Sequence, residues 1–308
     1  MSAERYVFGP VPSRRLGRSL GVDLVPFKTC SYDCIYCQLG RTTHKTIERR
    51  EWVPLQDVLA ELKGKLSARP DYITLSGSGE PTLFSRIQEL IDRIKDMTDV
   101  PVAVLTNGSL LWRPEVREGL TPADLIIPSL DAGDEEMFRR INRPHGAISF
   151  ENMLGGLIAL RDEFQGQYWL EILLLAGYTD TEAQVSKLAE CAARIRPHRV
   201  QLNTVTRPAA ESFAEAVPPE RLARLAAMFT PAAEVIADYR EVHQQGRFVA
   251  GRQEVLNMLR RRPCSIQDIA NGLSLHRNEV VKYIGELEAE KLLESSWCGG
   301  TLYYQAVG

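Results

Sequence analysis

One pattern limits the folds open to this chain. From about residue 19 to residue 205, short apolar runs alternate with longer amphipathic stretches. The runs are rich in valine, isoleucine and leucine, as strands buried on both faces of a sheet are. They predict strands over 20–26, 71–76, 101–106, 124–130, 168–175 and 199–205. The stretches between them predict helices over 55–67, 84–97, 149–164 and 181–195. Such alternation indicates an α/β fold with a parallel sheet, and six units predict a partial (βα)6 barrel of the TIM type.

The C-terminal part follows a different pattern. Beyond an expected helix over 219–229, three helices and a hairpin are predicted. The helices cover 252–262, 265–272, with Ser265 as N-cap, and 275–291, and the hairpin turns at Gly299–Gly300. Three helices followed by a two-stranded wing are the order of a winged helix-turn-helix. We therefore expect two domains, the barrel over residues 1–240 and a small winged helix-turn-helix domain over residues 241–308.

Charge and hydropathy argue against several classes of partner. The chain of 308 residues has a formal net charge of −3, so no strong overall attraction to nucleic acid or to an anionic membrane is expected. No window approaches the roughly 18 uninterrupted apolar residues of a membrane span, and the N-terminus lacks the apolar segment of a secretory signal. These features predict a cytoplasmic protein without a membrane partner.

Three of the six cysteines form a cluster. Cys30, Cys34 and Cys37 lie within eight residues, directly after the first predicted strand. In parallel α/β folds this is the face that carries the active site. Thiolates favour iron–sulfur clusters, zinc or copper(I), and three of them can hold a cubane while one iron stays open. A zinc loop is the alternative, with His44 as fourth ligand, but the second cysteine pair usual in such loops is missing.

The remaining cysteines are isolated in the sequence. Cys191, Cys264 and Cys298 each lie in an apolar or amphipathic context. We expect them to serve as small buried hydrophobic residues.

The spacing C-x-x-x-C-x-x-C, with the aromatic Tyr36 before the last cysteine, resembles the motif of the radical S-adenosylmethionine (SAM) superfamily. The resemblance implies that Cys30, Cys34 and Cys37 hold a [4Fe–4S] cluster whose open iron binds SAM, and that Tyr36 lies beside the adenine. It implies an enzyme in which one electron, from a donor such as flavodoxin or ferredoxin, cleaves SAM to a 5′-deoxyadenosyl radical. Cofactor chemistry of this kind leaves the protein to bind, orient and exclude water.

The ends of the second, third and fourth predicted strands carry further candidates for SAM binding. Residues 76–82 (SGSGEPT) resemble the G-G-E-P element of the family, which implies SAM contacts for Gly77, Ser78, Gly79 and Glu80. Thr106 and Asn107 are placed to hydrogen-bond a ribose or the methionine part of SAM, and Ser129 and Asp131 resemble family positions that face the ribose and the substrate. For the first two stretches the alternative is an ordinary turn.

Polar residues also alternate along the last two predicted strands. These are Glu171, Gln201 and Asn203. A buried polar side chain needs a partner, so these residues predict a polar barrel lumen that holds SAM, unless they bond to one another.

Candidate substrate contacts follow two of the strands. Arg143 and His145 lie after the fourth strand and Arg207 after the sixth, where each is placed to bind an anionic group or to lie in a solvated loop. Near the N-terminus, Arg14, Arg15 and Arg18 are expected as a solvated basic arm, with a cover over the open barrel as the alternative.

Over about residues 5–230 the chain resembles the wyosine-type group of iron–sulfur oxidoreductases. The tRNA wyosine enzymes carry extra cysteines before the cluster motif, whereas this chain has none before Cys30. The substrate is thus left among nucleic acid, peptide and small molecule, the first two through the predicted winged helix. Residues 247–308 have only one more basic than acidic residue, a weak footprint for phosphate binding. The competing hypothesis is an iron–sulfur redox sensor that binds DNA.

Overall fold

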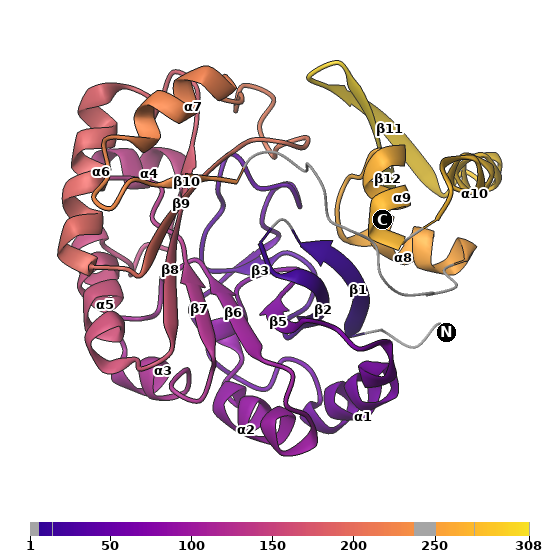
Figure 1. The fold of residues 1–308 in the computed structure, drawn as a ribbon, viewed down its shortest axis with the longest axis horizontal. Helices are drawn as coiled ribbons and strands as arrows, with labels where there is room; N and C mark the ends of the chain where they lie inside the picture. The colour runs from indigo at the N-terminus through magenta and orange to yellow at the C-terminus, as the bar shows by residue number, and fades with distance from the viewer. Residues whose placement is uncertain (1–5, 14, 237–250, 274, 308) are drawn as a thin grey trace.

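The computed structural model describes residues 6–13, 15–236, 251–273 and 275–307. Its centre is a curved eight-stranded sheet in the order β1-β2-β5-β6-β7-β8-β9-β10 (Figure 1). Six successive strands run parallel and match the six predicted ones. They are β2 (Gly17–Asp23), β5 (Tyr72–Ser76), β6 (Val102–Thr106), β7 (Leu125–Pro128), β8 (Gln167–Leu174) and β9 (Arg199–Thr204). The predicted α/β class and the partial TIM-type barrel are therefore confirmed.

Two strands extend this sheet beyond the prediction. β10 (Glu234–Val235) runs parallel to β9, and β1 (Val7–Ser13) pairs antiparallel with β2. β1 contains two prolines, which lack an N–H donor and are tolerated only where a strand lies at an edge or at an irregularity. Prolines conceal such a strand from a pattern based on apolar runs.

Helices cover the outer face of the sheet (Figure 1). Four of them match predicted ranges: α1 (Leu55–Lys65), α2 (Ile87–Met97), α5 (Phe150–Glu163) and α6 (Glu182–Ile195). The stripe of α2, made of Ile87, Leu90, Ile91 and Ile94, has no exposed surface. Burial of such stripes against the sheet is the main stabilising contribution to the barrel.

Two short helices were not predicted. α3 (Pro114–Glu118) follows β6 and α4 (Glu135–Ile141) follows β7. The carboxylate of Asp134 caps α4 by accepting a hydrogen bond from the Met137 N–H at 2.8 Å. Because α4 ends at Ile141, Arg143 and His145 lie in the segment that follows this helix.

After α7 (Pro219–Ala226), the C-terminal elements appear in the predicted order. They are α8 (Arg252–Arg261), α9 (Ile266–Leu273), α10 (Arg277–Ala289), β11 (Leu293–Cys298) and β12 (Thr301–Ala306). Ser265 caps α9 as expected, since its Oγ accepts from the Asp268 N–H at 3.1 Å. These elements share an apolar cluster separate from that of the barrel. Their assignment as a winged helix-turn-helix stays a prediction, and the expected boundary at residues 240 and 241 falls outside the described residues.

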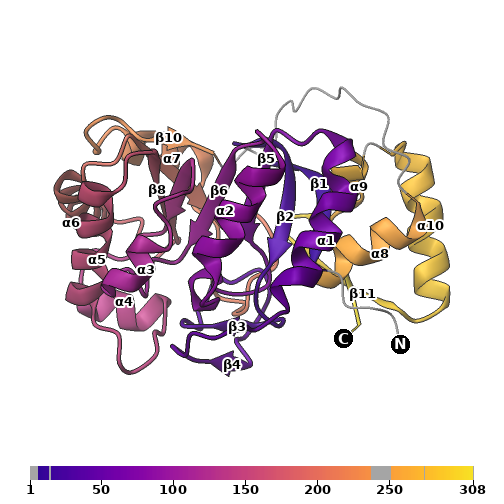
Figure 2. The same ribbon diagram turned by 90° about the horizontal axis from the view of Figure 1, so that it is seen from below.

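The C-terminal elements lie beside β1 and α1, at the open edge of the sheet (Figures 1 and 2). Polar contacts join them to the barrel. Arg261 pairs with Asp23 at 3.0 Å, Arg207 with Asp268 at 3.7 Å, and the Tyr303 hydroxyl donates to the Thr206 carbonyl at 2.8 Å. Among the described helices, none combines the length and the apolar character that a bilayer span requires.

Candidate functional site

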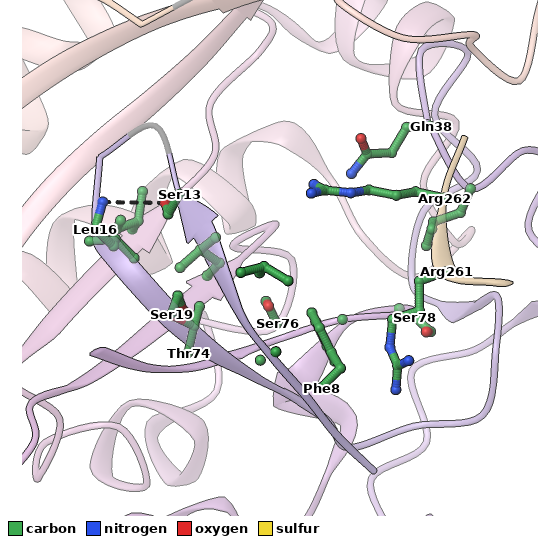
Figure 3. Close-up of a pocket in the computed structure, with 18 of the residues that line it drawn as sticks. Phe8, Ser13, Leu16, Ser19, Gln38, Thr74, Ser76, Ser78, Arg261 and Arg262 are labelled. Carbon is green, nitrogen blue, oxygen red and sulfur yellow. Dashed lines mark hydrogen bonds between the residues drawn. The ribbon is translucent and has the colours of Figure 1, made fainter. Parts of the chain in front are cut away.

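A cavity of about 790 Å³ lies between the barrel strands and the C-terminal elements (Figure 3). Its walls come from the carboxyl ends of the parallel strands, the cysteine loop and residues of α8 and α9. Its volume is within the range of pockets that enclose a small-molecule ligand, roughly 300–1,000 Å³. The position agrees with the rule that barrel active sites form at the carboxyl ends of the strands.

The three clustered cysteines all line this cavity. Short strands β3 (Thr29–Cys30) and β4 (His44–Lys45) pair in parallel and anchor the loop. Within it, the Cys37 N–H donates to the Cys34 carbonyl at 3.2 Å and thus fixes a tight turn. Burial and the neighbouring Glu80 carboxylate raise the pKa of the Cys30 thiol to about 12. Burial also raises the pKa of Cys34 and Cys37. The thiols therefore keep their protons until a metal binds and displaces them.

The surroundings of the sulfurs suit an iron–sulfur cluster. The Asn107 amide nitrogen lies 3.5 Å from the Cys30 sulfur and that of Asn142 lies 3.6 Å from the Cys34 sulfur, and donors of this kind tune such clusters. A cubane spreads its ligands over separate irons, so they need not converge on one point. Among the described residues, no three His, Cys, Asp or Glu side chains do so. His44, the alternative zinc ligand, is exposed and lies edge-on against Trp52.

The glycine loop after β5 contacts the cysteine loop directly. Gly79 forms a parallel bridge with Thr29, and a Cβ at Gly79 would collide with the Thr29 carbonyl. Gly77 has a φ of 97°, and a Cβ there would collide with the carboxylate of Asp23. Ser78 donates to that same carboxylate at 3.0 Å. Glycine is therefore required where two backbones approach this closely, and Ser78 ties the loop to β2.

Glu80 is buried and joins the ends of β5 and β6. Its carboxylate accepts from the Thr106 hydroxyl at 2.6 Å, from the Asn107 N–H at 2.8 Å, and from the hydroxyl and N–H of Thr82 at 2.6 and 3.0 Å. Burial raises the pKa of Glu80, against these hydrogen bonds, which lower it. Four donors occupy its acceptor sites, so Glu80 holds Thr106 and Asn107 in place at the cavity wall.

Tyr36 and Asp131 meet at the opposite side of the cysteine loop. The Tyr36 hydroxyl donates to the Asp131 carboxylate, which also accepts from the Leu173 N–H at 2.9 Å. Burial raises the pKa of Asp131 to about 6. Asn142, the C-cap of α4, donates to both groups at 2.9 and 3.2 Å. Asn142 is absent from the predicted site because no local pattern marks an amide that follows an unpredicted helix.

The polar lumen forms around Arg15. Its guanidinium pairs with Glu171 at 3.0 Å and donates to Gln201 at 3.2 Å, while Asn203 donates to Glu171 at 3.1 Å. Of the predicted lumen residues, Glu171 and Asn203 thus bond to each other, as in the alternative stated above, whereas Gln201 bonds to Arg15. Glu171, Asn203 and Ser129 line the cavity, whereas Gln201 is not among its lining residues.

The prediction for the N-terminal arginines needs correction. Arg15 is not part of a solvated arm, because the two polar strands of the lumen attract it inward. Arg18 hydrogen-bonds the Ala68 carbonyl at 2.9 Å, and Arg14 lies outside the described residues.

Of the three candidate substrate contacts, Arg207 lies apart from the other two. Arg207 is buried and lines the cavity, where it donates to Gln38 at 3.4 Å. Arg143 pairs with Glu211 at 2.5 Å, and the His145 ring accepts from the Ala147 N–H at 3.3 Å. Neither of them is among the lining residues.

The isolated cysteines lie apart from the site. Cys191 and Cys264 are buried and free, as expected of small hydrophobic residues. Cys298 is half-buried in β11.

An open parallel barrel with three clustered thiols beside a glycine loop is typical of enzymes that bind a metal cluster through thiolates. The family model described as the Radical SAM superfamily matches residues 24–189. A UPF0026 protein of Methanocaldococcus jannaschii is 41% identical over 226 residues, which cover 72% of this chain and 70% of that one. The chain therefore belongs to the radical SAM superfamily and, within it, to the UPF0026 proteins.

Other relatives share parts of the chain. A GTPase Obg of Brachyspira hyodysenteriae is 37% identical over 305 residues, 97% of this chain, which spans only 45% of that longer protein. The SAM-dependent tRNA 4-demethylwyosine synthase of M. jannaschii is 29% identical over 194 residues, 62% of this chain and 58% of that one. This agrees with the wyosine-type resemblance.

The fold has solved counterparts. A radical SAM methyltransferase from Sphaerobacter thermophilus superimposes with a TM-score of 0.53 at 16% identity, over 73% of this chain and 67% of that one. This likeness shows the shared fold. Radical SAM enzymes use a [4Fe–4S] cluster and SAM and require an electron donor, and this chain is an enzyme of that superfamily.

Proposed function

We propose that Cys30, Cys34 and Cys37 hold the [4Fe–4S] cluster and that the cavity beside them binds SAM and a substrate. One observation carries the proposal: the three thiols and the polar ends of the barrel strands line the same cavity. The cluster, when bound, supplies the electron that cleaves SAM reductively to a 5′-deoxyadenosyl radical. All other work falls to residues of this chain.

The chain's own residues bind and orient the cofactor. The backbone of Gly77–Gly79 borders the cysteine loop and offers polar groups to the amino group of SAM. Thr106 and Asn107, held by Glu80, face the methionine or ribose part. Tyr36, fixed by Asp131 and Asn142, borders the adenine, and Ser129 and Asn203 complete the polar lining.

Water is excluded by the elements around the cavity. Residues of α8 and α9 close its side at the open edge of the sheet, and exclusion protects a radical from side reactions. Flavodoxin or ferredoxin is a suitable electron donor, since Lys45 is exposed on β4, beside the cysteine loop, and attracts an acidic partner.

The protein is cytoplasmic and has two domains, the barrel over residues 1–240 and a recognition module over residues 241–308. Their separate apolar cluster supports the division. The module has the element order of a winged helix-turn-helix, with Arg277 and Lys282 exposed on α10. Nucleic acid and peptide are both substrates that such a module recognises.

The test is cluster reconstitution without air. Iron, sulfide and ultraviolet–visible spectra report the cluster, and 5′-deoxyadenosine release after dithionite and SAM reports the activity. The C-terminal module also supports a second candidate, a redox-sensing regulator. Specific DNA binding that depends on the cluster, without SAM cleavage, would decide for the regulator. A colourless protein loaded with zinc would refute both.

A further inference from the structure

Four arginines line the cavity. Within the described residues, three of them have a carboxylate partner. The pairs are Arg15–Glu171 at 3.0 Å, Arg207–Asp268 at 3.7 Å and Arg261–Asp23 at 3.0 Å. Each of these pairs offsets its own charge, so the three arginines contribute little net positive potential to the cavity.

Arg262 is the fourth arginine and differs from the others. It is the C-cap of α8, where its N–H donates to the Met258 carbonyl, and its side chain is half-buried. Figure 3 shows this side chain extending into the cavity, whereas the Arg261 side chain turns toward Phe8. In the part of the chain that the structure describes, the Arg262 guanidinium forms neither an ion pair nor a hydrogen bond.

The carboxylates of the cavity are already engaged. The acidic lining residues are Glu80, Asp131, Glu171 and Glu254. The first three bond to the partners described above, and Glu254 accepts from the Gly251 N–H at 3.0 Å. The charge of Arg262 is therefore left for a group that enters the cavity.

A second donor faces the same part of the cavity. Gln38 follows the last cluster cysteine, and its amide oxygen accepts from Arg207 at 3.4 Å. Its NH2 group is then turned away from Arg207, and Figure 3 shows this nitrogen on the side where the Arg262 guanidinium lies. A guanidinium and an amide N–H without an acceptor between them bind an anionic oxygen group well.

We propose that Arg262 and Gln38 bind an anionic oxygen group of the substrate, a phosphate or a carboxylate. The inference rests on the proposed function, because it takes the cavity as the active site. A half-enclosed guanidinium has lost part of its hydration, and an entering anion restores these interactions. The C-terminal elements thus supply a substrate contact that the barrel strands do not.

The test uses anion binding to the reconstituted full-length protein saturated with SAM. Inorganic phosphate and acetate serve as probes. Nuclear magnetic resonance line broadening measures the binding of each probe, and saturation transfer also measures that of acetate. R262Q should weaken probe binding by about tenfold or more, as expected for hydrogen bonds to a charged group, whereas R262K should retain most of it. R260Q is the matched control, because Arg260 lies on α8 two residues away, exposed and outside the lining.

Each outcome either supports or overturns a proposal. Tighter binding of phosphate assigns a phosphorylated substrate, and tighter binding of acetate assigns a carboxylic acid. The proposal is overturned if neither probe binds the wild type, or if R262Q and R260Q bind both probes as the wild type does. It is also overturned if R262Q weakens SAM binding while probe binding persists, since Arg262 would then contact SAM. Anion binding that depends on Arg262 in a protein without cluster or SAM cleavage would refute the proposed function alone.

Discussion

At the scale of single residues, the site depends on buried polar groups whose partners are protein groups. Glu80 and Asp131 each accept hydrogen bonds from the ends of neighbouring strands, and a buried acceptor that loses its donors costs about 1–3 kcal/mol. Such groups fix the shape of the cavity before any ligand enters.

Substituting Cys34 with Ser should abolish the cluster. Alkoxide is a poor replacement for thiolate as an iron ligand, so we expect iron content and 5′-deoxyadenosine release to fall to background. Anaerobic reconstitution followed by iron analysis measures this. Cys298→Ser is the control, because Cys298 lies in β11 away from the cavity, and it should keep both. Full turnover in C34S would remove Cys34 from the ligand set.

The pH dependence of the apoprotein tests Asp131. Its pKa is raised from 3.8 to about 6, so the folded state binds a proton more tightly than the unfolded state does. The stabilisation is fully present below pH 4 and is lost as the pH rises through 6, with an amplitude of up to about 3 kcal/mol. As the pH rises from 4 to 7, the unfolding free energy of the wild type should fall by this amount relative to that of Asp131→Asn. Urea titration of both proteins across this pH range measures the change.

Asp134 provides the opposite sign. Lys187 and the Met137 N–H lower its pKa, so its contribution is present above the unfolded pKa and disappears as the pH falls. Asp134→Asn should therefore lose most stability near neutral pH. The same trend in both variants would contradict the assignment of Asp131.

At the scale of elements, the sequence pattern predicted what is local and missed what is not. The six parallel strands and four large helices were found because apolar periodicity is a property of neighbouring residues. β1 was missed because of its prolines and α4 because it is short. The site was predicted from motifs, yet the contact of Arg15 with Glu171 spans 156 residues and that of Asn142 with Tyr36 spans 106. No local pattern encodes such pairings.

Two adjacent glycines of α5 should respond in opposite ways to alanine. A Cβ at Gly155 meets no atom within 4 Å, whereas one at Gly156 would collide with the backbone of Trp112. Gly155→Ala should stabilise the protein by about 0.5–1 kcal/mol through helix propensity. Gly156→Ala should destabilise it by about 1–3 kcal/mol, as overpacking does. Thermal unfolding of both variants checks this, and equal effects would be inconsistent with the packing of α5 on the loop before α3.

At the scale of the whole molecule, the C-terminal elements complete the barrel that the sheet leaves open. They cover its edge at β1, line the cavity and contact the end of β2 through the Arg261–Asp23 ion pair. The Arg261 guanidinium lies over the Phe8 ring and bonds Asp23, which in turn accepts from Ser78. The chain of contacts runs from α8 to the loop proposed to bind SAM, so the two parts of the molecule should act together on that cofactor.

Arg261 is therefore expected to position the glycine loop. Arg261→Met leaves the buried Asp23 carboxylate without its cation, which costs about 3 kcal/mol where a buried pair is broken. The unpaired carboxylate then moves with its hydrogen-bond donor Ser78 and shifts the loop, so SAM affinity in the reconstituted protein should fall roughly tenfold, which corresponds to about 1.4 kcal/mol. Adding Asp23→Asn to Arg261→Met should recover part of the stability, because the unpaired charge is gone. Arg260→Met, at an exposed position of the same helix, should change neither quantity. Calorimetric titration of SAM and urea unfolding measure the two effects separately, and a loss of stability with unchanged SAM affinity would show that the contact holds the two parts together without acting on the cofactor site.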